Sequence, residues 1–431
     1  MNIKNKVSYK SILFWNLTGS IINALASVIL LTAVNRILGI KSGAGDIFSL
    51  GFSISQMMYI LACYNVRIYQ STDVTGKFSF NDYFIFRMIT CALTIAASTV
   101  YILFHGYEGW KFGVIFLLCI YRIVEAFSDV FQGVFQLKER LDLAGKSIAI
   151  KILAASTFFI LSLLLSGDLL ISTLWFFIGG LLFFFLYDIP IYLKIAKEYP
   201  EERLNLRSFS WRNTKELFIV CFPLFLNGYL LMAIYNEPKL VIGSLTESGL
   251  LSVGAQTYYN ILFMPAFAMN LLIIFFRPFL TSMAIHWSRK EYKETYKKLG
   301  AIYAAILGGM VAALILGYFL GIPVLSAVYG TGSGLSPYRS ELMIIIVAGA
   351  INSLSTITDQ AVTLIRKQHL LLGVYLIALL SAKLLSSRLI PVLALKGAAL
   401  SFFFSCLIIL IFTLLIFFIC SQRMIRKDST P

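Results

Sequence analysis

Long apolar stretches recur along the chain, each close to the roughly 20 residues that an α-helix needs to cross a bilayer. Short polar segments separate them, and none shows the period-two alternation of a membrane β-strand. The pattern predicts an all-α polytopic membrane protein with about twelve transmembrane helices. The expected spans are 11–34, 45–65, 83–104, 112–135, 147–166, 169–193, 217–235, 252–275, 300–320, 342–365, 370–389 and 398–420.

The longest polar stretch, residues 194–216, divides the expected helices into two sets of six. We interpret it as a cytoplasmic linker between an N-terminal lobe, residues 1–193, and a C-terminal lobe, residues 217–431, that ends in a short cytoplasmic tail. Lys and Arg concentrate at both termini and in the loops expected on the same side as this linker. The positive-inside rule therefore predicts that both termini are cytoplasmic.

Composition excludes an ordinary soluble domain, because 59% of the 431 residues are hydrophobic and only 13% are charged. A net charge of +15 would indicate nucleic-acid binding in a soluble protein. Here the basic residues lie mainly in short loops between apolar stretches, where they set the orientation of the helices. We therefore expect no nucleic-acid partner.

Sequence motifs for catalysis or cofactor binding are missing. There is no phosphate-binding loop followed by a helix, the three histidines are solitary, and the six cysteines lie singly without metal-ligand spacing. We expect no catalytic site, no metal and no cofactor, although coupling to a proton or sodium gradient stays open. Movement of a substrate is therefore more plausible than its conversion, and the protein is not expected to be an enzyme.

One apolar stretch carries charges at membrane depth. Arg122, Glu125 and Asp129, together with Gln132 and Gln136, are spaced three or four residues apart and so share one face of a helix. A charge near the bilayer centre costs roughly 2.5 to 3.5 kcal/mol on insertion scales, so this face must meet protein or a water-filled cavity. Two interpretations remain: a structural ion pair between Arg122 and Glu125 at i, i+3, or a role in a transport pathway.

Further charged residues lie in or beside the other spans. Guanidinium groups pair bidentately with phosphate, so a cavity lined by them suits an amphiphile with an anionic head group. The candidates for substrate binding are Arg36, Arg67, Arg122, Lys239 and Arg277. The candidates for charge partners or coupling-cation sites are Glu125, Asp129 and Asp359. For Arg67 and Arg277 the alternative is that the side chain only snorkels to the cytoplasmic interface.

Several short segments are similar to those of a known transporter family. They are residues 35–39 (NRILG), 45–50 (GDIFSL), 66–74 (VRIYQSTDV), 125–133 (EAFSDVFQG), 140–147 (RLDLAGKS), 223–226 (PLFL), 236–239 (NEPK), 263–265 (FMP) and 277–278 (RP). In combination with the expected topology, they resemble the bacterial polysaccharide repeat-unit flippases. These are the Wzx-type O-antigen and capsule exporters of the multidrug/oligosaccharidyl-lipid/polysaccharide (MOP) transporter superfamily.

The resemblance implies a V-shaped bundle of two six-helix lobes that works by alternating access. It implies an undecaprenyl-pyrophosphate-linked oligosaccharide as substrate, moved to the outer leaflet of a bacterial plasma (inner) membrane for O-antigen, capsule or exopolysaccharide assembly. A cationic cavity would receive the pyrophosphate and sugars, with Arg36, Arg122 and Lys239 as its candidates. A polysaccharide polymerase and chain-length machinery would be partners.

Two other functions compete with this interpretation. The first is a cation-coupled small-molecule or drug antiporter of the same superfamily, which would need a dominant acidic site and cationic substrates. The second is a membrane-bound polysaccharide enzyme such as a polymerase, which normally has a large outer loop. The expected outer loops here are short.

Overall fold

The computed structural model describes residues 8–429 apart from 72, 74–76, 206–209, 267–282, 284, 285, 288 and 333, and these residues contain helices but no strand. The longer helices of the N-terminal half are α1 (Tyr9–Leu38), α2 (Ala44–Cys63), α4 (Phe80–Phe104), α5 (Gly109–Leu137), α6 (Leu141–Ser166), α7 (Leu169–Phe183) and α8 (Ile189–Glu198). Those that follow are α9 (Trp211–Glu247), α10 (Ala255–Leu262), α13 (Tyr292–Leu316), α14 (Ile322–Tyr329), α15 (Arg339–Leu364) and α16 (Leu371–Ser429). Short pieces connect them: α3 (Val66–Gln70), the 3-10 turns η1 (Ile40–Ser42), η3 (Pro200–Glu202), η6 (Ser336–Tyr338) and η7 (Gln368–Leu370), and the π-helical turns η2 (Phe184–Asp188) and η5 (Gly317–Gly321).

The helices agree with the predicted fold of about twelve spans. Within the described residues, nine helical segments are long and apolar enough to cross a membrane. Helix α5 is not among them because Lys111, Arg122, Glu125 and Asp129 interrupt its apolar sequence. The long α16 counts twice, since Ala394 has a φ of 49° and breaks it into the eleventh and twelfth expected helices. Helix α10 is the described part of the eighth, whose continuation lies outside the described residues.

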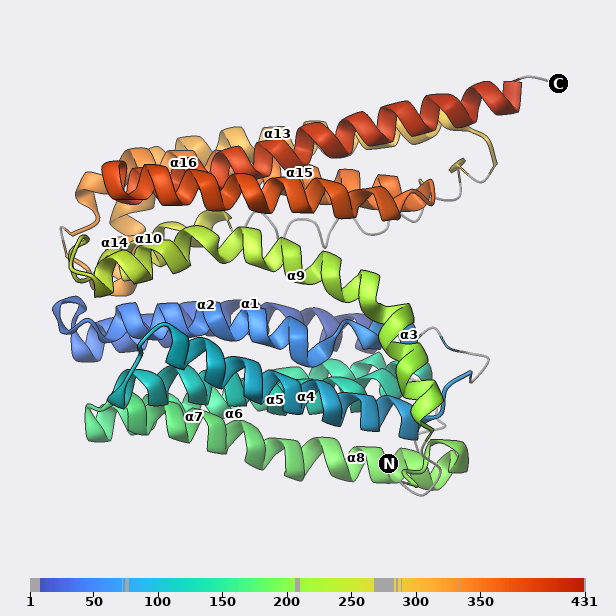
Figure 1. The fold of residues 1–431 in the computed structure, drawn as a ribbon, viewed down its shortest axis with the longest axis horizontal. Coiled ribbons are helices and arrows are strands. Elements are labelled where there is room, and N and C mark those ends of the chain that lie inside the picture. Colours follow the sequence, from blue (N-terminus) through green and yellow to red (C-terminus); the bar gives the residue numbers. More distant parts are fainter. Residues whose placement is uncertain are drawn as a thin grey trace. The chain divides into compact units, whose positions relative to one another are not determined.

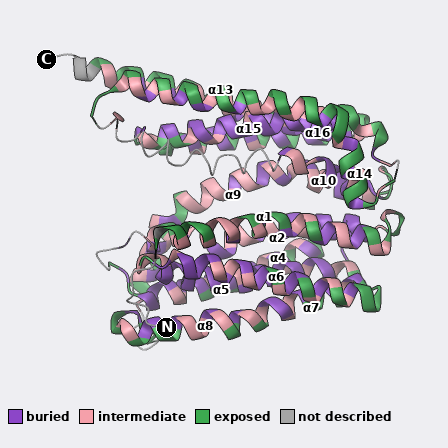
Figure 2. Ribbon diagram, turned by 180° about the vertical axis from the view of Figure 1, so that it is seen from behind, coloured by how far each residue is buried: buried purple, intermediate pink, exposed green. Residues whose placement is uncertain are grey.

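The chain forms two compact units, Met1–Met232 and Ala233–Pro431, and the boundary lies inside α9. In the first unit, the helices α1, α2 and α4 to α7 run side by side (Figure 1). Helix α5 is at the centre of this unit and packs against α2, α3, α4, α6, α7 and α8. Figure 2 shows that most of α5 is buried, so its charged face meets protein as the sequence predicts.

The polar stretch 194–216 is largely integrated into the first unit. Its beginning is the last part of α8, where Ile195 and Ala196 pack into an aromatic core with Phe80 and Phe131. Its end is already helical, because α9 begins at Trp211. Leu217, one turn and a half later, joins the same core. The first half of α9 therefore belongs to the first unit by packing.

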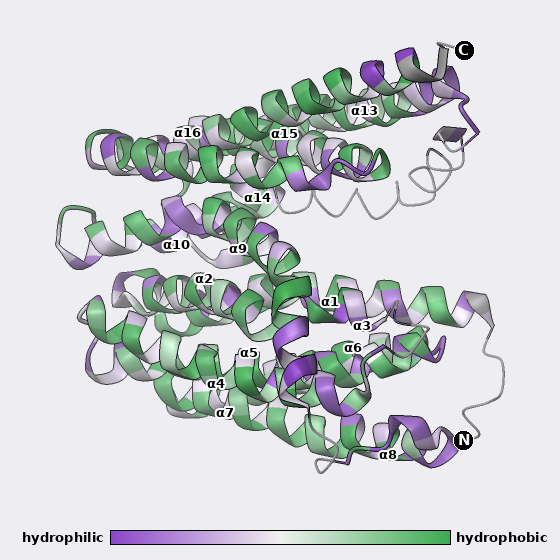
Figure 3. Cartoon of the chain, turned by 45° about the vertical axis from the view of Figure 1, so that its right-hand side comes forward, coloured by the Kyte–Doolittle hydropathy of each residue, from purple (hydrophilic) through white to green (hydrophobic). Residues whose placement is uncertain are grey.

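The second unit is built around α15, which packs against α13, α16 and α10. Most of its length is buried, in contrast to α13, of which only a small part is buried. Large apolar side chains such as Leu165, Phe104 and Val392 are also exposed, at 88%, 84% and 80%. Figure 3 shows hydrophobic residues along most of the helices, with hydrophilic residues gathered near the end of α8 and the C-terminus. Exposed apolar surface of this extent suits contact with lipid.

Glycines bring α1 and α6 into backbone contact. A Cβ added at Gly19 would lie 2.6 Å from the carbonyl oxygen of Gly145, and one added at Gly145 would lie 2.3 Å from that of Trp15. Small residues that allow such close approach are a common means of packing membrane helices, where no hydrophobic effect drives association. The contact between α1 and α6 therefore depends on the absence of a side chain at these two positions.

We expect Gly145→Val to force α1 and α6 apart, because the added side chain would meet the backbone of α1 rather than a movable side chain. Overpacking of this kind costs about 1–3 kcal/mol or more, so the amount of folded protein in the membrane should fall several-fold. Gly308→Val in α13 is the matched control, since no atom lies within 4 Å of a Cβ there. Quantitative immunoblots and thermal unfolding measure both variants, and equal behaviour of the two would contradict the packing argument.

Candidate functional site

The candidate site begins at a break between α2 and α3. Tyr64 and Asn65 adopt left-handed backbone conformations, with φ of 49° and 51°, which end α2 and redirect the chain into α3. The last turn of α2 is held from α4: Arg87 Nη1 and Thr90 Oγ1 donate to the carbonyl oxygen of Ala62 at 2.6 and 2.7 Å. Asparagine often adopts this conformation but tyrosine rarely does, so neighbouring contacts must hold Tyr64 in it.

Two amide side chains add such contacts. Asn65 Nδ2 donates to the carbonyl oxygen of Leu224 in α9 at 2.8 Å. Gln70 Nε2, in α3, donates to the carbonyl oxygen of Val130 in α5 at 3.0 Å. Its amide also lies where a Cβ at Gly133 would be, since that atom would fall 2.2 Å from Gln70 Oε1. These contacts hold the five-residue α3 closely against α5.

This arrangement places Arg67 of α3 over the charged face of α5. Its Nη1 lies 3.2 Å from Asp129 Oδ1, and Arg87 Nη2 lies 2.8 Å from Asp129 Oδ2. Each oxygen of this one carboxylate therefore contacts a different guanidinium. The Arg87 side chain is fully buried, whereas that of Arg67 is 23% exposed. Since the two cations share one anion, this group carries one uncompensated positive charge, and the accessible part of it is Arg67.

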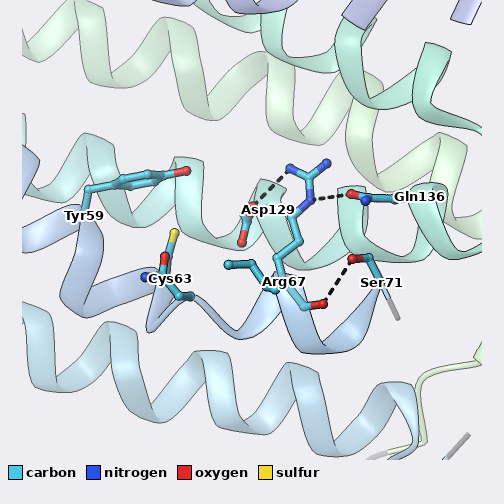
Figure 4. A pocket seen from close by; sticks show the side chains of 8 residues that line it. Tyr59, Cys63, Arg67, Ser71, Asp129 and Gln136 are labelled. Atoms are coloured by element: carbon cyan, nitrogen blue, oxygen red, sulfur yellow. Dashed lines mark hydrogen bonds and ion pairs between the residues drawn. The ribbon is translucent and has the colours of Figure 1, made fainter. Parts of the chain in front are cut away.

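Two glutamines of α5 orient the Arg67 guanidinium further. Nη1 also donates to Gln132 Oε1 at 2.9 Å, and Nε donates to Gln136 Oε1 at 3.3 Å. Figure 4 shows the guanidinium held between Asp129 and Gln136. Its second terminal nitrogen, Nη2, donates to no residue that the structure describes. Arg67 thus has a fixed orientation and keeps free donor capacity.

A pocket of ≈ 470 Å³ opens beside this guanidinium. Its lining residues are Tyr59, Cys63, Asn65, Arg67, Ile68, Ser71, Asp129 and Gln136, all in the first unit. They offer hydroxyl and amide groups, one aromatic ring and the Arg67 guanidinium, whose partner Asp129 is also paired with Arg87 behind the pocket wall. Such a site can bind an anion through charge-assisted hydrogen bonds from Arg67, and phosphate oxygens match the planar guanidinium edge.

The Arg122–Glu125 pair expected from the i, i+3 spacing is present. Arg122 Nη1 lies 2.5 Å from Glu125 Oε2, and Nε donates to Ser55 Oγ at 3.2 Å. The guanidinium also lies over the rings of Phe52 and Tyr59, 4.8 and 5.8 Å from their centroids. Both charged side chains are about nine-tenths buried. These contacts favour the structural interpretation for Arg122 and Glu125.

The other sequence candidates are not part of this group. Arg36 is exposed in the last turn of α1, at the end of α2 opposite to Arg67. In the second unit, Lys239 Nζ lies 4.3 Å from the centroid of the Phe263 ring. Asp359 Oδ2 accepts a hydrogen bond from Tyr375 at 2.6 Å. Arg277 lies outside the described residues.

Sequence reasoning missed three buried charged residues of the first unit. Arg87 completes the group around Asp129, while Lys151 of α6 and Asp188 of η2 lie 3.7 Å apart and are almost fully buried. Asp188 also accepts a hydrogen bond from Ser128. Arg87 and Lys151 are each the only charged residue within their predicted spans, which was a usable signal, because a lone charge at membrane depth needs an interior partner.

Comparison with known proteins identifies the fold. No family model matches the chain. The capsular polysaccharide biosynthesis protein CapF of Staphylococcus aureus is 25% identical over 389 residues, which is 89% of this chain and 92% of that protein. The lipid II flippase MurJ in an inward closed conformation aligns with a TM-score of 0.68 and 13% identity, covering 92% of this chain and 86% of MurJ. An inward-facing multidrug resistance transporter of the MATE family, in the MOP superfamily, aligns with a TM-score of 0.63 and 12% identity. The alignment covers 95% of this chain and 95% of that transporter.

These likenesses establish the architecture. The chain is a multi-pass membrane protein with the helical fold that MurJ and the MATE transporters share. The solved structures are transporters and flippases rather than enzymes. At 12–13% identity they show the fold alone, so function must be argued from the residues of the site.

We expect Asp129→Ala to destabilise the protein strongly, because Arg87 would remain fully buried without a carboxylate partner. Removing one partner of a buried ion pair typically costs about 3–5 kcal/mol. Arg67→Ala should cost much less, since Arg67 is partly exposed and Arg87 would keep its contact with Asp129. Thermal unfolding of the purified variants compares the two changes, and an equal loss of stability would show that Asp129 serves both arginines alike.

Proposed function

We propose that this protein is a flippase that moves an undecaprenyl-pyrophosphate-linked oligosaccharide across the bacterial plasma membrane for the assembly of a surface polysaccharide such as capsule, O-antigen or exopolysaccharide. The observation that carries the proposal is the uncompensated guanidinium of Arg67 at the wall of a pocket, with a donor that no described residue accepts. A cation in excess at membrane depth is costly unless an anionic ligand offsets it. A diphosphate head group supplies that anion.

The composition of the pocket suits a head group that joins phosphate to sugar. Beside Arg67, the hydroxyl of Ser71 and the amides of Asn65 and Gln136 offer hydrogen-bonding groups of the kind that carbohydrates need. Tyr59 adds an aromatic ring. The exposed apolar surface around the unit provides the matching environment for a polyprenyl chain. An amphiphile with an anionic, sugar-bearing head therefore fits these residues better than a small hydrophobic cation.

The known proteins support the same substrate class. CapF of Staphylococcus aureus is a capsular polysaccharide biosynthesis protein, and MurJ is a lipid II flippase. Under this proposal, the oligosaccharide that reaches the outer leaflet is passed to a polymerase and chain-length machinery. The excess of Lys and Arg in one set of loops supports a cytoplasmic location for both termini.

The second unit contains residues that fit a transporter of this kind. Lys239 lies over Phe263 and forms no ion pair with any residue of the described ranges, so it is a second cation suited to an anionic substrate. Asp359 Oδ1 is buried and has no hydrogen-bond partner among the described residues. We assign Asp359 as the candidate for a coupling cation, either a proton or sodium.

A cation-coupled drug antiporter is the alternative that the MATE fold suggests. It would need a negatively charged binding pocket, because the substrates expected for this class are cationic. The one carboxylate that lines the pocket, Asp129, is already shared by two arginines. The resulting positive charge disfavours cationic substrates and favours the flippase.

Deletion of the gene in its host should cause polyprenyl-pyrophosphate-linked oligosaccharide to accumulate in the cytoplasmic leaflet, and the wild-type gene should clear it. We expect Arg67→Gln to reduce clearance at least about tenfold, because the anion loses its charged donor. Lys77→Gln is the control, since Lys77 is an exposed cation of the same unit that pairs with Glu216. Mass spectrometry of extracted lipids, with membrane abundance measured in parallel, gives the comparison. Normal lipids in the deletion strain would refute the flippase, and full activity of Arg67→Gln would refute the site.

A further inference from the structure

We propose that Arg87 is a positioning residue that makes Arg67 available to the anionic substrate, by occupying Asp129 and so leaving the pocket with a positive charge. This inference rests on the proposed function, because it concerns the anion site at Arg67. Arg87 does not line the pocket, and its side chain is fully buried. It acts on the substrate only through the shared carboxylate and through the end of α2.

The geometry divides Asp129 between the two arginines. Arg87 holds Oδ2 at 2.8 Å, while Arg67 contacts Oδ1 at the longer distance of 3.2 Å. Without Arg87, Asp129 and Arg67 would form a simple neutral pair, and an incoming phosphate would have to compete with the carboxylate for the guanidinium. With Arg87 in place, the negative charge of Asp129 is already compensated from the protein interior. The charge of Arg67 then remains for the ligand.

The same guanidinium fixes the place where Arg67 enters the site. Arg87 Nη1 donates to the carbonyl oxygen of Ala62 at 2.6 Å, two residues before the left-handed break at Tyr64 and Asn65. The side chain thereby joins the end of α2 to Asp129 of α5 across a single planar group. A lysine has a single nitrogen in place of these two, so it lacks the planar fork that serves both acceptors here.

Nearby charged residues do not take over this role. In the part of the chain that the structure describes, Arg122 pairs with Glu125 on α5, and Lys151 lies next to Asp188. These two pairs are each balanced. Of these three groups of described residues, that of Arg67, Arg87 and Asp129 is the one whose cations outnumber its carboxylates. The excess charge of the pocket therefore depends on Arg87.

The test is a double-mutant cycle at Arg87 and Asp129 in the purified full-length protein. Binding of inorganic pyrophosphate is measured by calorimetry at low salt. Arg87→Gln should weaken binding by about tenfold, as expected for the loss of one nearby charge. Asp129→Asn leaves two uncompensated cations at the site, so it should bind about tenfold more tightly than wild type. The double variant Arg87→Gln, Asp129→Asn again leaves Arg67 as the one cation in excess, so its affinity should return to within about threefold of wild type.

Two features of the cycle separate this role from a merely structural one. A structural role would leave the double variant as weak as Arg87→Gln, whereas charge compensation predicts rescue. Thr90→Val is the matched control, because Thr90 is equally buried and donates to the same Ala62 oxygen without contacting Asp129. It should bind like wild type. If Arg87→Gln does not fold, the comparison of Asp129→Asn with the double variant measures the same contribution of Arg87, again about tenfold.

Three results would overturn the proposal. Wild-type affinity in folded Arg87→Gln would show that Arg87 does not influence the pocket. A folded double variant that fails to recover binding would show that charge is not its mode of action. Equal binding of pyrophosphate by wild type and Arg67→Gln would show that Arg67 is not an anion site. Only this third result would also count against the proposed function. The first two results leave the flippase proposal intact.

Discussion

The shared carboxylate of Asp129 is the interaction on which the arrangement of the first unit depends. Its two oxygens receive one guanidinium from α3 and one from α4, while Asp129 itself belongs to α5. Three chain segments are thereby joined at a single group in a region where apolar packing discriminates weakly between helices, since lipid and core are equally apolar. Losing Asp129 would leave the fully buried Arg87 without a carboxylate, so the packing of α4 against α5 is strongly specified at this point.

This constraint explains why α5 is central although it carries charged residues along one face. A helix with charges on one face cannot lie at the lipid boundary, so the other helices surround it and present their apolar residues outward. The glycine contacts of α1 with α6 complete the layer by close backbone approach rather than by polar bonds. The interior of the unit is therefore polar along the charged face of α5, and its outer surface is apolar.

The apolar stretches of the sequence predicted the fold well, because the bilayer thickness sets the length of each span and such stretches can be recognised directly in the sequence. The inward orientation of the α5 face was also predictable from spacing. The partner of Asp129 was not, because Arg67 reaches it through a left-handed break at Tyr64 and Asn65, where no glycine marks the turn. Arg87 was missed although it is a lone charge in its span. The packing of α9 on the first unit was hidden by the polar residues that precede it.

Two charged groups on α5 show why residue type alone does not assign function. Arg122 and Asp129 are two turns apart on one face, and each belongs to an arginine–carboxylate contact. Around Arg122, one cation meets one anion and aromatic rings cover the guanidinium, so no charge is in excess. Around Asp129, the buried Arg87 compensates the carboxylate, and a pocket opens beside Arg67. The number of partners per carboxylate, rather than the presence of an arginine, distinguishes a structural ion pair from a site that can receive an anion.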